Sequence, residues 1–353
     1  MKRVLLLTPV FYPSIGGTEE QVKLLGEEFI RLGYTVDIIT YKKGRQERQE
    51  KIFGMNIFTF GGFFDFLRFF TKNKNYDIII SRQYYRHSFY LGIGKFLKII
   101  KDKSVVCTDS GGDKDEICVI KSKSYFLYKI YFFFIAQNDY LNCLNNDNIR
   151  HLQNIYKGKP KYLDKITNIY NGIDISSFEK TKKKKNIKNI LFLGRFEKEK
   201  GIFETIKAFK NIENRTLQLH LIGYGEKKGE QEIKSLIKND ARILFHGKKY
   251  GEEKQKIIDG IDLFVFPTYY PEGQPVTLTE MAIKNIPIIS TDIANTKDIY
   301  GDNILYVEKK NEADLQKKME WIIENISDFS YNYTEALKKI DVRNIVRKFL
   351  DLK

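Results

Sequence analysis

The hydrophobic pattern of this chain alternates short, wholly apolar runs with longer segments in which apolar residues recur at helical spacing. The first apolar run, residues 4–8, ends at Pro9, and an amphipathic segment to about residue 32 separates it from a second run, 36–40. Short runs without polar alternation are typical of strands covered on both faces of a sheet. The order strand, loop, helix, strand therefore predicts the start of a doubly wound α/β sheet.

The second half of the chain repeats this pattern. A chain of 353 residues is long enough for two domains with separate cores. The basic run Lys182–Lys185 lies between the two halves and is expected to belong to an exposed linker. The strands predicted after it are residues 189–194, 217–222, 243–247, 262–267 and 286–292.

Two segments of the first half combine aromatic residues with lysines at helical spacing, Phe89–Lys101 and Lys121–Ile135. An aromatic stripe of this kind is most often part of a core. The same segments also fit helices that lie on an anionic membrane surface, with their lysines in the headgroup layer. Both interpretations stay open at this point. The longest apolar run, Tyr125–Ala136, is shorter than the roughly 20 residues that span a bilayer.

Positive charge is concentrated in the first half. The formal net charge is +15, and residues 1–170 contribute +10 of it, with 27 Lys and Arg against 17 Asp and Glu. Such an excess favours an anionic partner. A compositional bias toward Lys, Asn and Ile explains the same excess without selection for binding, so this alternative also stays open. No nucleic-acid partner is expected, and the charged segment 42–51 is expected to form a loop.

The cysteines and histidines follow no metal-binding or disulfide pattern. Cys107, Cys118 and Cys143 lack CxxC spacing and a matching histidine pattern, so we expect buried free thiols and no metal site. His87, one of four histidines, is expected to be a surface or capping residue. The first residues lack the features of a signal peptide, which predicts a cytoplasmic protein.

Residues 264–282 contain the strongest candidate site. Their apolar start predicts a buried strand, a loop follows, and a helix is expected to begin near Val276, after Pro275. Glu272 and Glu280 flank the N-terminus of this helix, whose free N–H groups and positive dipole end favour a phosphate. Ionised carboxylates accept strong hydrogen bonds from hydroxyls. The combination predicts a nucleotide-sugar site.

The string Pro271-Glu-Gly-Gln-Pro-x4-Glu280-Met-Ala resembles the E-x7-E motif of the family 4 retaining glycosyltransferases, which have the GT-B architecture. Both acids match, as do the glycine and the Met-Ala pair. The resemblance implies that Glu280 holds the ribose hydroxyls and that Glu272 contacts the transferred sugar as a catalytic residue. The donor-binding residues that it implies in this stretch are Gly273, Gln274, Pro275, Val276, Thr277 and Glu280.

Three further strings resemble the family. Gly16 and Gly17 belong to a PxxGGxE string at a predicted helix start, where glycines allow a ligand to approach the backbone. Arg195 and Lys200 belong to a GRxxxxKG string, which implies a clamp for the donor diphosphate and a catalytic role. The string Gly223-Tyr-Gly225 resembles the GxG of the family, which lies near the nucleotide.

The sequence departs from the family after the predicted strand 104–108. Family members commonly carry a histidine there that faces the donor sugar, whereas this chain has Asp109 at about that position. Asp109 is therefore a catalytic candidate by position, but a carboxylate cannot act as a neutral imidazole does. The sequence does not decide which residue contacts the sugar or the acceptor hydroxyl.

The resemblance runs from Pro9 to about Asn325 and implies the α/β GT-B fold, with two Rossmann-like, doubly wound domains facing each other across a cleft. The second domain is expected to bind the nucleotide-sugar and the first the acceptor. The implied segments are a first domain of residues 1–174, a linker of residues 175–188, a second domain of residues 189–340, and a last helix, 341–353, that crosses back to the first domain.

The implied reaction moves a sugar from a UDP-sugar or GDP-sugar to a glycan acceptor, with retention of configuration and without a metal ion or other cofactor. A lipid-linked acceptor, a protein peripherally bound to the inner face of the membrane, and a role in bacterial surface polysaccharide synthesis are expected. Two alternatives are a GT-B enzyme of another type, such as a sugar-nucleotide epimerase, and an inactive glycan-binding subunit. The joint presence of the four residues of the clamp and the acidic motif favours the transferase.

Overall fold

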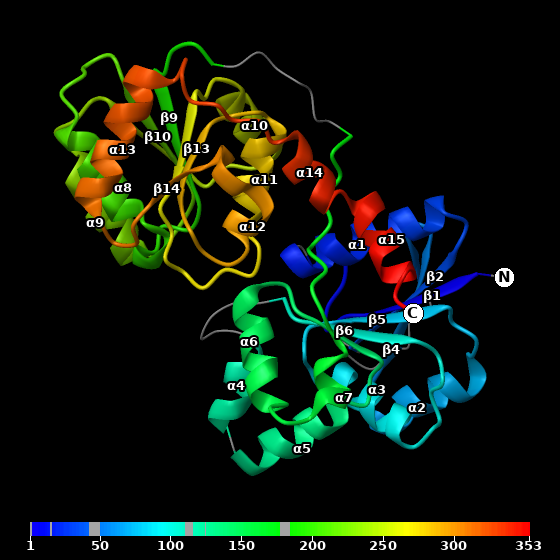
Figure 1. Ribbon diagram of the computed structural model, residues 1–353. Helices are drawn as coiled ribbons and strands as arrows, with labels where there is room; N and C mark the ends of the chain where they lie inside the picture. Colours follow the sequence, from blue (N-terminus) through cyan, green and yellow to red (C-terminus); the bar gives the residue numbers. More distant parts are fainter. Residues whose placement is uncertain (1, 15, 42–49, 110–115, 124, 177–183) are drawn as a thin grey trace. The chain divides into compact units, whose positions relative to one another are not determined.

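Apolar strands form two separate sheets in the computed structural model, and each sheet belongs to its own compact unit. Unit 1 comprises Met1–Asp174, Pro271–Gln274 and Ile340–Lys353, and unit 2 comprises Ile175–Tyr270 and Pro275–Lys339. Figure 1 shows both units, which are described separately below. The structure describes residues 2–14, 16–41, 50–109, 116–123, 125–176 and 184–353.

The sheet of unit 1 has the strand order β3-β4-β2-β1-β5-β6-β7-β8. Its strands pair in parallel except for the antiparallel pair of β3 and β4. Residues 4–7 of the central strand are fully buried, as expected for a strand covered on both faces. The strands are β1 (Arg3–Leu7), β2 (Thr35–Tyr41), β3 (Glu50–Ile52), β4 (Met55–Phe60), β5 (Ile78–Arg82), β6 (Ser104–Cys107), β7 (Tyr140–Asn142) and β8 (Ile166–Thr167).

Helices cover both faces of this sheet. The helices α1 and α15 lie on one face, and α2, α3 and α5 lie on the other (Figure 1). The last helix packs on α1, and backbone hydrogen bonds join Ile173 to both Ile340 and Val342, as the resemblance implies. The helices are α1 (Gly17–Arg31), α2 (Phe63–Lys72), α3 (Arg86–Phe96), α4 (Glu116–Lys123), α5 (Tyr125–Ile135), α6 (Asn146–Ile155), α7 (Pro160–Leu163) and α15 (Val342–Leu350).

The sheet of unit 2 has the order β11-β10-β9-β12-β13-β14, and its strand pairs are all parallel. It consists of β9 (Asn189–Leu193), β10 (Gln218–Ile222), β11 (Ile243–Gly247), β12 (Leu263–Phe266), β13 (Ile288–Thr291) and β14 (Leu305–Val307). The helices α8, α9 and α13 lie on one face, and α10, α11 and α12 lie on the other (Figure 1).

The elements of unit 2 that follow these strands include a short 3₁₀ turn, η2, that is important for the site. They are η2 (Lys198–Lys200), α8 (Ile202–Asn211), α9 (Lys227–Ile237), α10 (Gly251–Asp259), α11 (Val276–Ile283), α12 (Thr296–Tyr300), η3 (Gly301–Asn303), α13 (Glu312–Asn325) and α14 (Thr334–Ile340).

Three local expectations are corrected by the structure. The segment 42–51 is not wholly a loop, since β3 begins at Glu50, and residues 42–49 lie outside the described part of the chain. The predicted helix 89–101 ends at Phe96 because Lys98 has a positive φ and the N–H groups of Ile99 and Ile100 both turn back to one carbonyl. The predicted helix 121–135 is divided between α4 and α5.

Of the basic run 182–185, residues 182 and 183 lie outside the described residues. Cys107 and Cys143 are buried free thiols as expected, but Cys118 is only half-buried, with its Sγ 3.7 Å from Nδ1 of His151. Among the described residues, no helix is long and apolar enough to cross a bilayer.

Candidate active site

The candidate residues of unit 2 follow three neighbouring strands, β10, β9 and β12. Because these strands are parallel, their carboxyl ends lie at one edge of the sheet, where open α/β sheets bind ligands. Arg195 follows β9, Gly223 follows β10, and the loop that leads to α11 follows β12. Lys200 ends the 3₁₀ turn η2, after the same strand as Arg195.

Arg195 and Lys200 are brought together by the ring of Tyr270. The ring centroid lies 4.9 Å from the guanidinium carbon of Arg195 and 4.1 Å from Nζ of Lys200. Backbone hydrogen bonds hold the ring in place, because the N–H groups of Tyr269 and Tyr270 both donate to the carbonyl of Glu199. Two cations on one aromatic ring form a positively charged site that suits a diphosphate. Tyr270 is thus a site residue that the sequence interpretation missed.

The two cations differ in exposure. Lys200 is 7% exposed to solvent, whereas the side chain of Arg195 is 38% exposed. Nη1 of Arg195 lies 2.5 Å from Oε1 of Glu197. A half-exposed ion pair on neighbouring residues is weak and easily rearranged. Arg195 can therefore exchange Glu197 for a phosphate oxygen without leaving a buried charge.

The glycines of unit 2 are required by backbone packing. A Cβ on Gly223 would lie 1.8 Å from the carbonyl oxygen of Gly194, and one on Gly225 would lie 2.7 Å from that of Phe196. Gly201 has φ +77°, and a Cβ on it would lie 2.5 Å from the carbonyl oxygen of Pro267. These close approaches join the loops that follow β9, β10 and β12, so the glycines bring the candidate residues to one place.

Helix α11 begins at Val276 with Pro275 as its N-cap, which confirms the predicted helix start. Val276 is exposed and Thr277 is half-buried. Glu280, on the second turn, forms an ion pair with Lys254 of α10, in which Nζ of the lysine lies 2.7 Å from Oε1 of the glutamate. Lys254 gave no signal in the sequence, because an exposed lysine on an amphipathic helix is ordinarily solvated.

The loop residues before α11 group with unit 1. A Cβ on Gly273 would lie 2.2 Å from the carbonyl oxygen of Asp109. Gln274 exchanges two hydrogen bonds with the backbone of Asn171, at 3.0 and 3.2 Å. Glu272 directly precedes Gly273 in this loop and is half-buried. The structure therefore brings Gly273 and Gln274 together with Asp109, while Glu280 belongs to unit 2.

Asp109 is the centre of a buried polar network in unit 1. Its carboxylate forms an ion pair with Arg82, at the end of β5, and accepts a 3.2 Å hydrogen bond from Thr18. Arg82 also donates to Oδ1 of Asn171 at 2.6 Å, and Gln83 donates to Thr18. Burial raises the pKa of Asp109, while the guanidinium of Arg82 opposes this change.

The N-terminus of α1 lies beside this network. The helix begins at Gly17, its N-cap is Gly16, and Thr18 of its first turn contacts Asp109. Gly17 has open space around its Cα, whereas a Cβ on Gly16 would meet only the flexible carboxylate of Glu19. The predicted glycine pair therefore lies next to Asp109.

His87 is a core residue, so the expectation of a surface or capping histidine was wrong. The ring is fully buried, with Nε2 2.7 Å from the carbonyl oxygen of Arg82 and Nδ1 3.1 Å from the hydroxyl of Tyr41. Burial lowers the pKa of His87 to about 4. A neutral ring that donates from Nε2 and accepts from Tyr41 satisfies both nitrogen atoms. His87 thus supports the backbone of Arg82 and has no place among the donor-binding residues.

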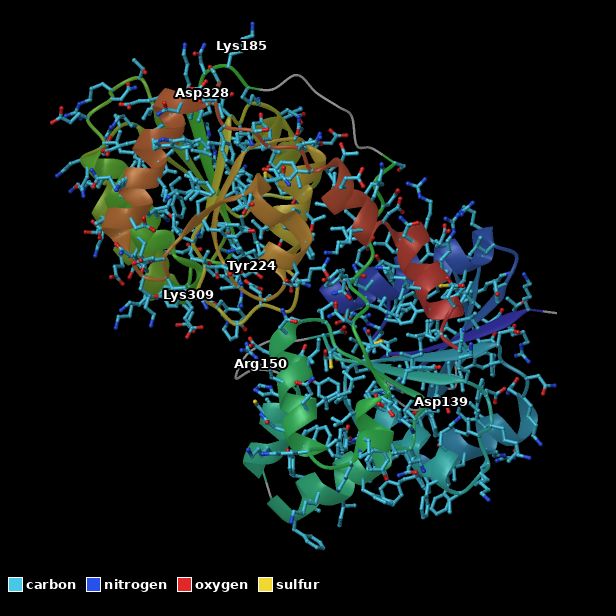
Figure 2. The ribbon with its side chains drawn as sticks, in the orientation of Figure 1. Asp139, Arg150, Lys185, Tyr224, Lys309 and Asp328 are labelled. Atoms are coloured by element: carbon cyan, nitrogen blue, oxygen red, sulfur yellow. The ribbon has the colours of Figure 1, made fainter. Side chains whose placement is uncertain are left out.

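A further cluster next to the unit 2 site consists of Tyr224, Lys248 and Tyr250. Tyr224, labelled in Figure 2, lies between the two glycines of the loop after β10. The amino group of Lys248 is 4.8 Å from the ring centroid of Tyr224 and 4.9 Å from that of Tyr250. Since the N–H of Phe196 donates to the carbonyl of Tyr224, this cluster adjoins the loop of Arg195.

The part of the chain that carries the two cations and the two glutamates matches a known protein family. Residues 174–339 match the family model "Glycosyl transferases group 1". The matched region covers all of unit 2 and includes both cations and both candidate glutamates. Of unit 1 it includes only Asp174 and Pro271–Gln274.

Relatives of known name cover different parts of the chain. CapM of Staphylococcus aureus, a capsular polysaccharide biosynthesis glycosyltransferase, is 27% identical over 143 residues, which are 38% of this chain and 37% of CapM. The uncharacterized glycosyltransferase MJ1069 of Methanocaldococcus jannaschii is 23% identical over 284 residues, which are 73% of this chain and 69% of that protein. TuaC of Bacillus subtilis, named for teichuronic acid biosynthesis, matches over only 26% of its own length.

Solved structures match over nearly the whole chain. HepE of Anabaena in complex with UDP has a TM-score of 0.75 at 14% identity and covers 99% of this chain and 98% of its own. Sucrose-phosphate synthase of Thermosynechococcus elongatus has a TM-score of 0.70 at 16% identity, with 99% and 97% covered. The fold is GT-B. This confirms the fold class that the sequence resemblance implies.

Proposed function

We propose that this chain is a retaining glycosyltransferase that moves a sugar from a UDP-sugar or GDP-sugar to a glycan acceptor. In the proposed reaction, the bond from the anomeric carbon to the diphosphate oxygen breaks, and its electron pair leaves with the nucleoside diphosphate. The acceptor oxygen forms the new bond to the same carbon and loses its proton. Retention means that the new bond has the configuration of the old one.

The observation that carries this proposal is the placement of Arg195 and Lys200 against one ring, that of Tyr270, at the carboxyl edge of a parallel sheet. The negative charge on the diphosphate grows as the sugar leaves, so fixed cations stabilise the transition state more than the bound donor. The N-terminus of α11 adds free N–H groups to the same edge. We further propose that these groups replace a divalent cation.

The comparisons support the donor class. The HepE structures are described as complexes with UDP and with UDP-glucose. Polysaccharide biosynthesis appears in the name of CapM. For this chain we accordingly propose a nucleoside diphosphate sugar as donor and a growing surface glycan as acceptor.

A donor panel tests the proposal. Purified protein is incubated with UDP- and GDP-sugars, with and without oligosaccharide acceptors, and the products are analysed by mass spectrometry and NMR. We expect a new glycosidic product that retains the donor configuration. An inverted product contradicts the retaining mechanism, an isomerised nucleotide-sugar indicates an epimerase, and donor binding without any product indicates an inactive subunit.

The same assay tests the absence of a metal requirement. Full activity in excess EDTA is expected. Complete inhibition that Mg²⁺ reverses contradicts the proposed role of Arg195 and Lys200 as the only cations at the diphosphate.

We also propose that the acceptor is linked to a membrane lipid and that unit 1 binds the inner face of the membrane. The excess charge of residues 1–170 supports this, at about 1 kcal/mol per basic residue near an anionic surface. Lys95 is not one of the residues that contact headgroups, because its amino group lies 2.7 Å from Asp139, which is labelled in Figure 2, and its side chain is mostly buried.

A further inference from the structure

A cavity of about 700 Å³ lies in unit 1, outside both groups of candidate residues. Side chains of α5, α6 and α7 and of the turn between the last two line most of it, and these helices are labelled in Figure 1. Three of its ten lining residues are lysines, and none of the ten is acidic. The lysines are Lys121, Lys129 and Lys159.

The inner wall of the cavity is aromatic and rigid. Tyr156 is buried and its hydroxyl donates to the carbonyl of Phe132 at 2.8 Å. The ring of Tyr156 contacts that of Tyr162, with centroids 5.3 Å apart, and the ring of Tyr128 contacts that of Phe132 at 5.0 Å. A cavity lined by lysines and by aromatic rings suits a ligand that combines an anionic group with a short apolar segment.

The same helix that lines the cavity presents large apolar side chains to solvent. On α5, Phe126 is 71% exposed and Leu127 is 61% exposed, and Ile130 and Phe133 are also exposed. Residues 126, 130 and 133 are spaced four and three apart, so they share one face of the helix. Phe133 belongs both to this face and to the cavity wall. The apolar face and the basic cavity are therefore continuous.

We propose that this cavity binds the phosphate group of an anionic membrane lipid, while the exposed face of α5 enters the apolar part of the bilayer. The inference rests on the proposed membrane-bound acceptor and assigns a discrete lipid site to unit 1. A soluble phosphate accounts for the lysines but leaves the exposed face of α5 without a partner. A bilayer accounts for both, because interfacial helices bury an apolar face beside basic residues.

Vesicle binding of the whole chain tests this site. Sedimentation is measured with phosphatidylglycerol vesicles and with phosphatidylcholine vesicles at low salt. The variant Lys129→Gln with Lys159→Gln removes two cavity lysines. The matched control is Lys157→Gln with Lys161→Gln, which removes the same charge from exposed neighbours of Lys159 that do not line the cavity.

We expect the cavity variant to reduce partition into phosphatidylglycerol vesicles roughly thirtyfold, from about a fivefold effect for each of the two basic residues removed, and the control several times less. The change Phe126→Ser with Leu127→Ser is expected to reduce partition as well. Equal losses in the cavity variant and its control overturn the inference. So does tight binding of free glycerol phosphate that depends on the cavity lysines, because it identifies a soluble ligand.

UDP binding by calorimetry, measured on every variant, separates this inference from the proposed function. All variants are expected to bind UDP as the unmodified chain does, which also shows that they are folded. Vesicle binding that depends on the cavity lysines supports the lipid site even in a chain that transfers no sugar. Loss of UDP binding only in the cavity variant contradicts the separation of the two sites.

Discussion

Unit 1 and unit 2 both place charged residues at the carboxyl edge of a parallel sheet, but the two sets have different surroundings. In unit 1, the side chain of Arg82 is 3% exposed and its partners are Asp109 and Asn171. In unit 2, Arg195 is 38% exposed and, with Lys200, lies against an aromatic ring. A buried pair must stay paired, whereas cations on a ring can accept a ligand anion. We therefore expect changes to the buried pair of unit 1 to affect stability and changes to the cations of unit 2 to affect binding and turnover.

The largest effect is expected from separating the buried pair. Arg82→Met leaves the carboxylate of Asp109 buried without its cation, which costs about 3–5 kcal/mol of unfolding free energy. The control is Arg86→Met, which removes an exposed charge at the start of α3. Denaturant unfolding is the measurement. Recovery of most of the loss in the double variant Arg82→Met with Asp109→Leu is expected, because it removes both charges.

An unaltered unfolding free energy in Arg82→Met would show that the pair is solvated in the folded protein. In that case Asp109 becomes available as a catalytic group. The comparison between the units then fails, since both sets of charged residues are open to a ligand.

The second prediction concerns pH and again belongs to unit 1. The folded pKa of His87, about 4, lies below its ordinary value of 6.5, so the unfolded chain takes up a proton first as the pH falls. The contribution of His87 is fully present above pH 6.5 and is lost as the pH falls toward 4. Since one pKa unit corresponds to about 1.4 kcal/mol, the loss amounts to about 3 kcal/mol.

Unfolding free energies measured from pH 7 to pH 4 check this prediction. His87→Phe is expected to be less stable at pH 7, because the carbonyl of Arg82 loses its donor, but to depend less on pH. A slope that is the same in both proteins excludes His87 as the group that titrates.

Much of the fold could be predicted from local patterns. Fully apolar runs such as β12 became buried parallel strands, and α11 began at the residue after Pro275. Asn285, which follows α11, has φ +51°, which asparagine tolerates better than most residues. The helix end at Phe96 could not be predicted, because Ile100 keeps its apolar spacing and is buried through a turn.

The site was predicted less completely, for a physical reason. Family strings mark residues that contact a ligand in family members, which is why Arg195 and Lys200 were candidates from the sequence. They do not mark the neighbours of the candidate residues. These neighbours are Tyr270 beside the two cations, Lys254 beside Glu280, and Arg82 beside Asp109. Arg82 alone carried a usable signal, since it is a charged residue at the end of an apolar strand.

The third prediction tests the clamp of unit 2. Lys200→Ala and Arg195→Ala are each expected to lower turnover about 100-fold, because each removes a group that stabilises the leaving diphosphate. Lys198→Ala is the matched control, since Lys198 is exposed in the same 3₁₀ turn. Both clamp variants should keep the unfolding free energy of the unmodified chain within about 1 kcal/mol. Equal turnover in Lys200→Ala and Lys198→Ala would place the diphosphate elsewhere.

The smallest expected effect separates the two glutamates. Glu280 belongs to unit 2, and its carboxylate pairs with Lys254 of α10 at 2.7 Å, in a half-exposed position. If it holds the ribose hydroxyls, Glu280→Gln weakens UDP or GDP binding by about tenfold, since a charge-assisted hydrogen bond becomes a neutral one. Lys254→Gln is the control: it removes the ion pair but leaves the acceptor for the ribose, so nucleotide affinity should change less.

Glu272 should behave in the opposite way, because the proposed contact is with the transferred sugar. Glu272→Gln is expected to leave UDP or GDP affinity unchanged in calorimetry and to lower turnover with the complete donor. The half-buried Glu272 groups with unit 1, beside Gly273 and its contact with Asp109, whereas Glu280 and the two cations belong to unit 2. A loss of nucleotide affinity in Glu272→Gln that equals the loss in Glu280→Gln would mean that both acids serve the ribose. The division of roles between the two units would then have to be abandoned.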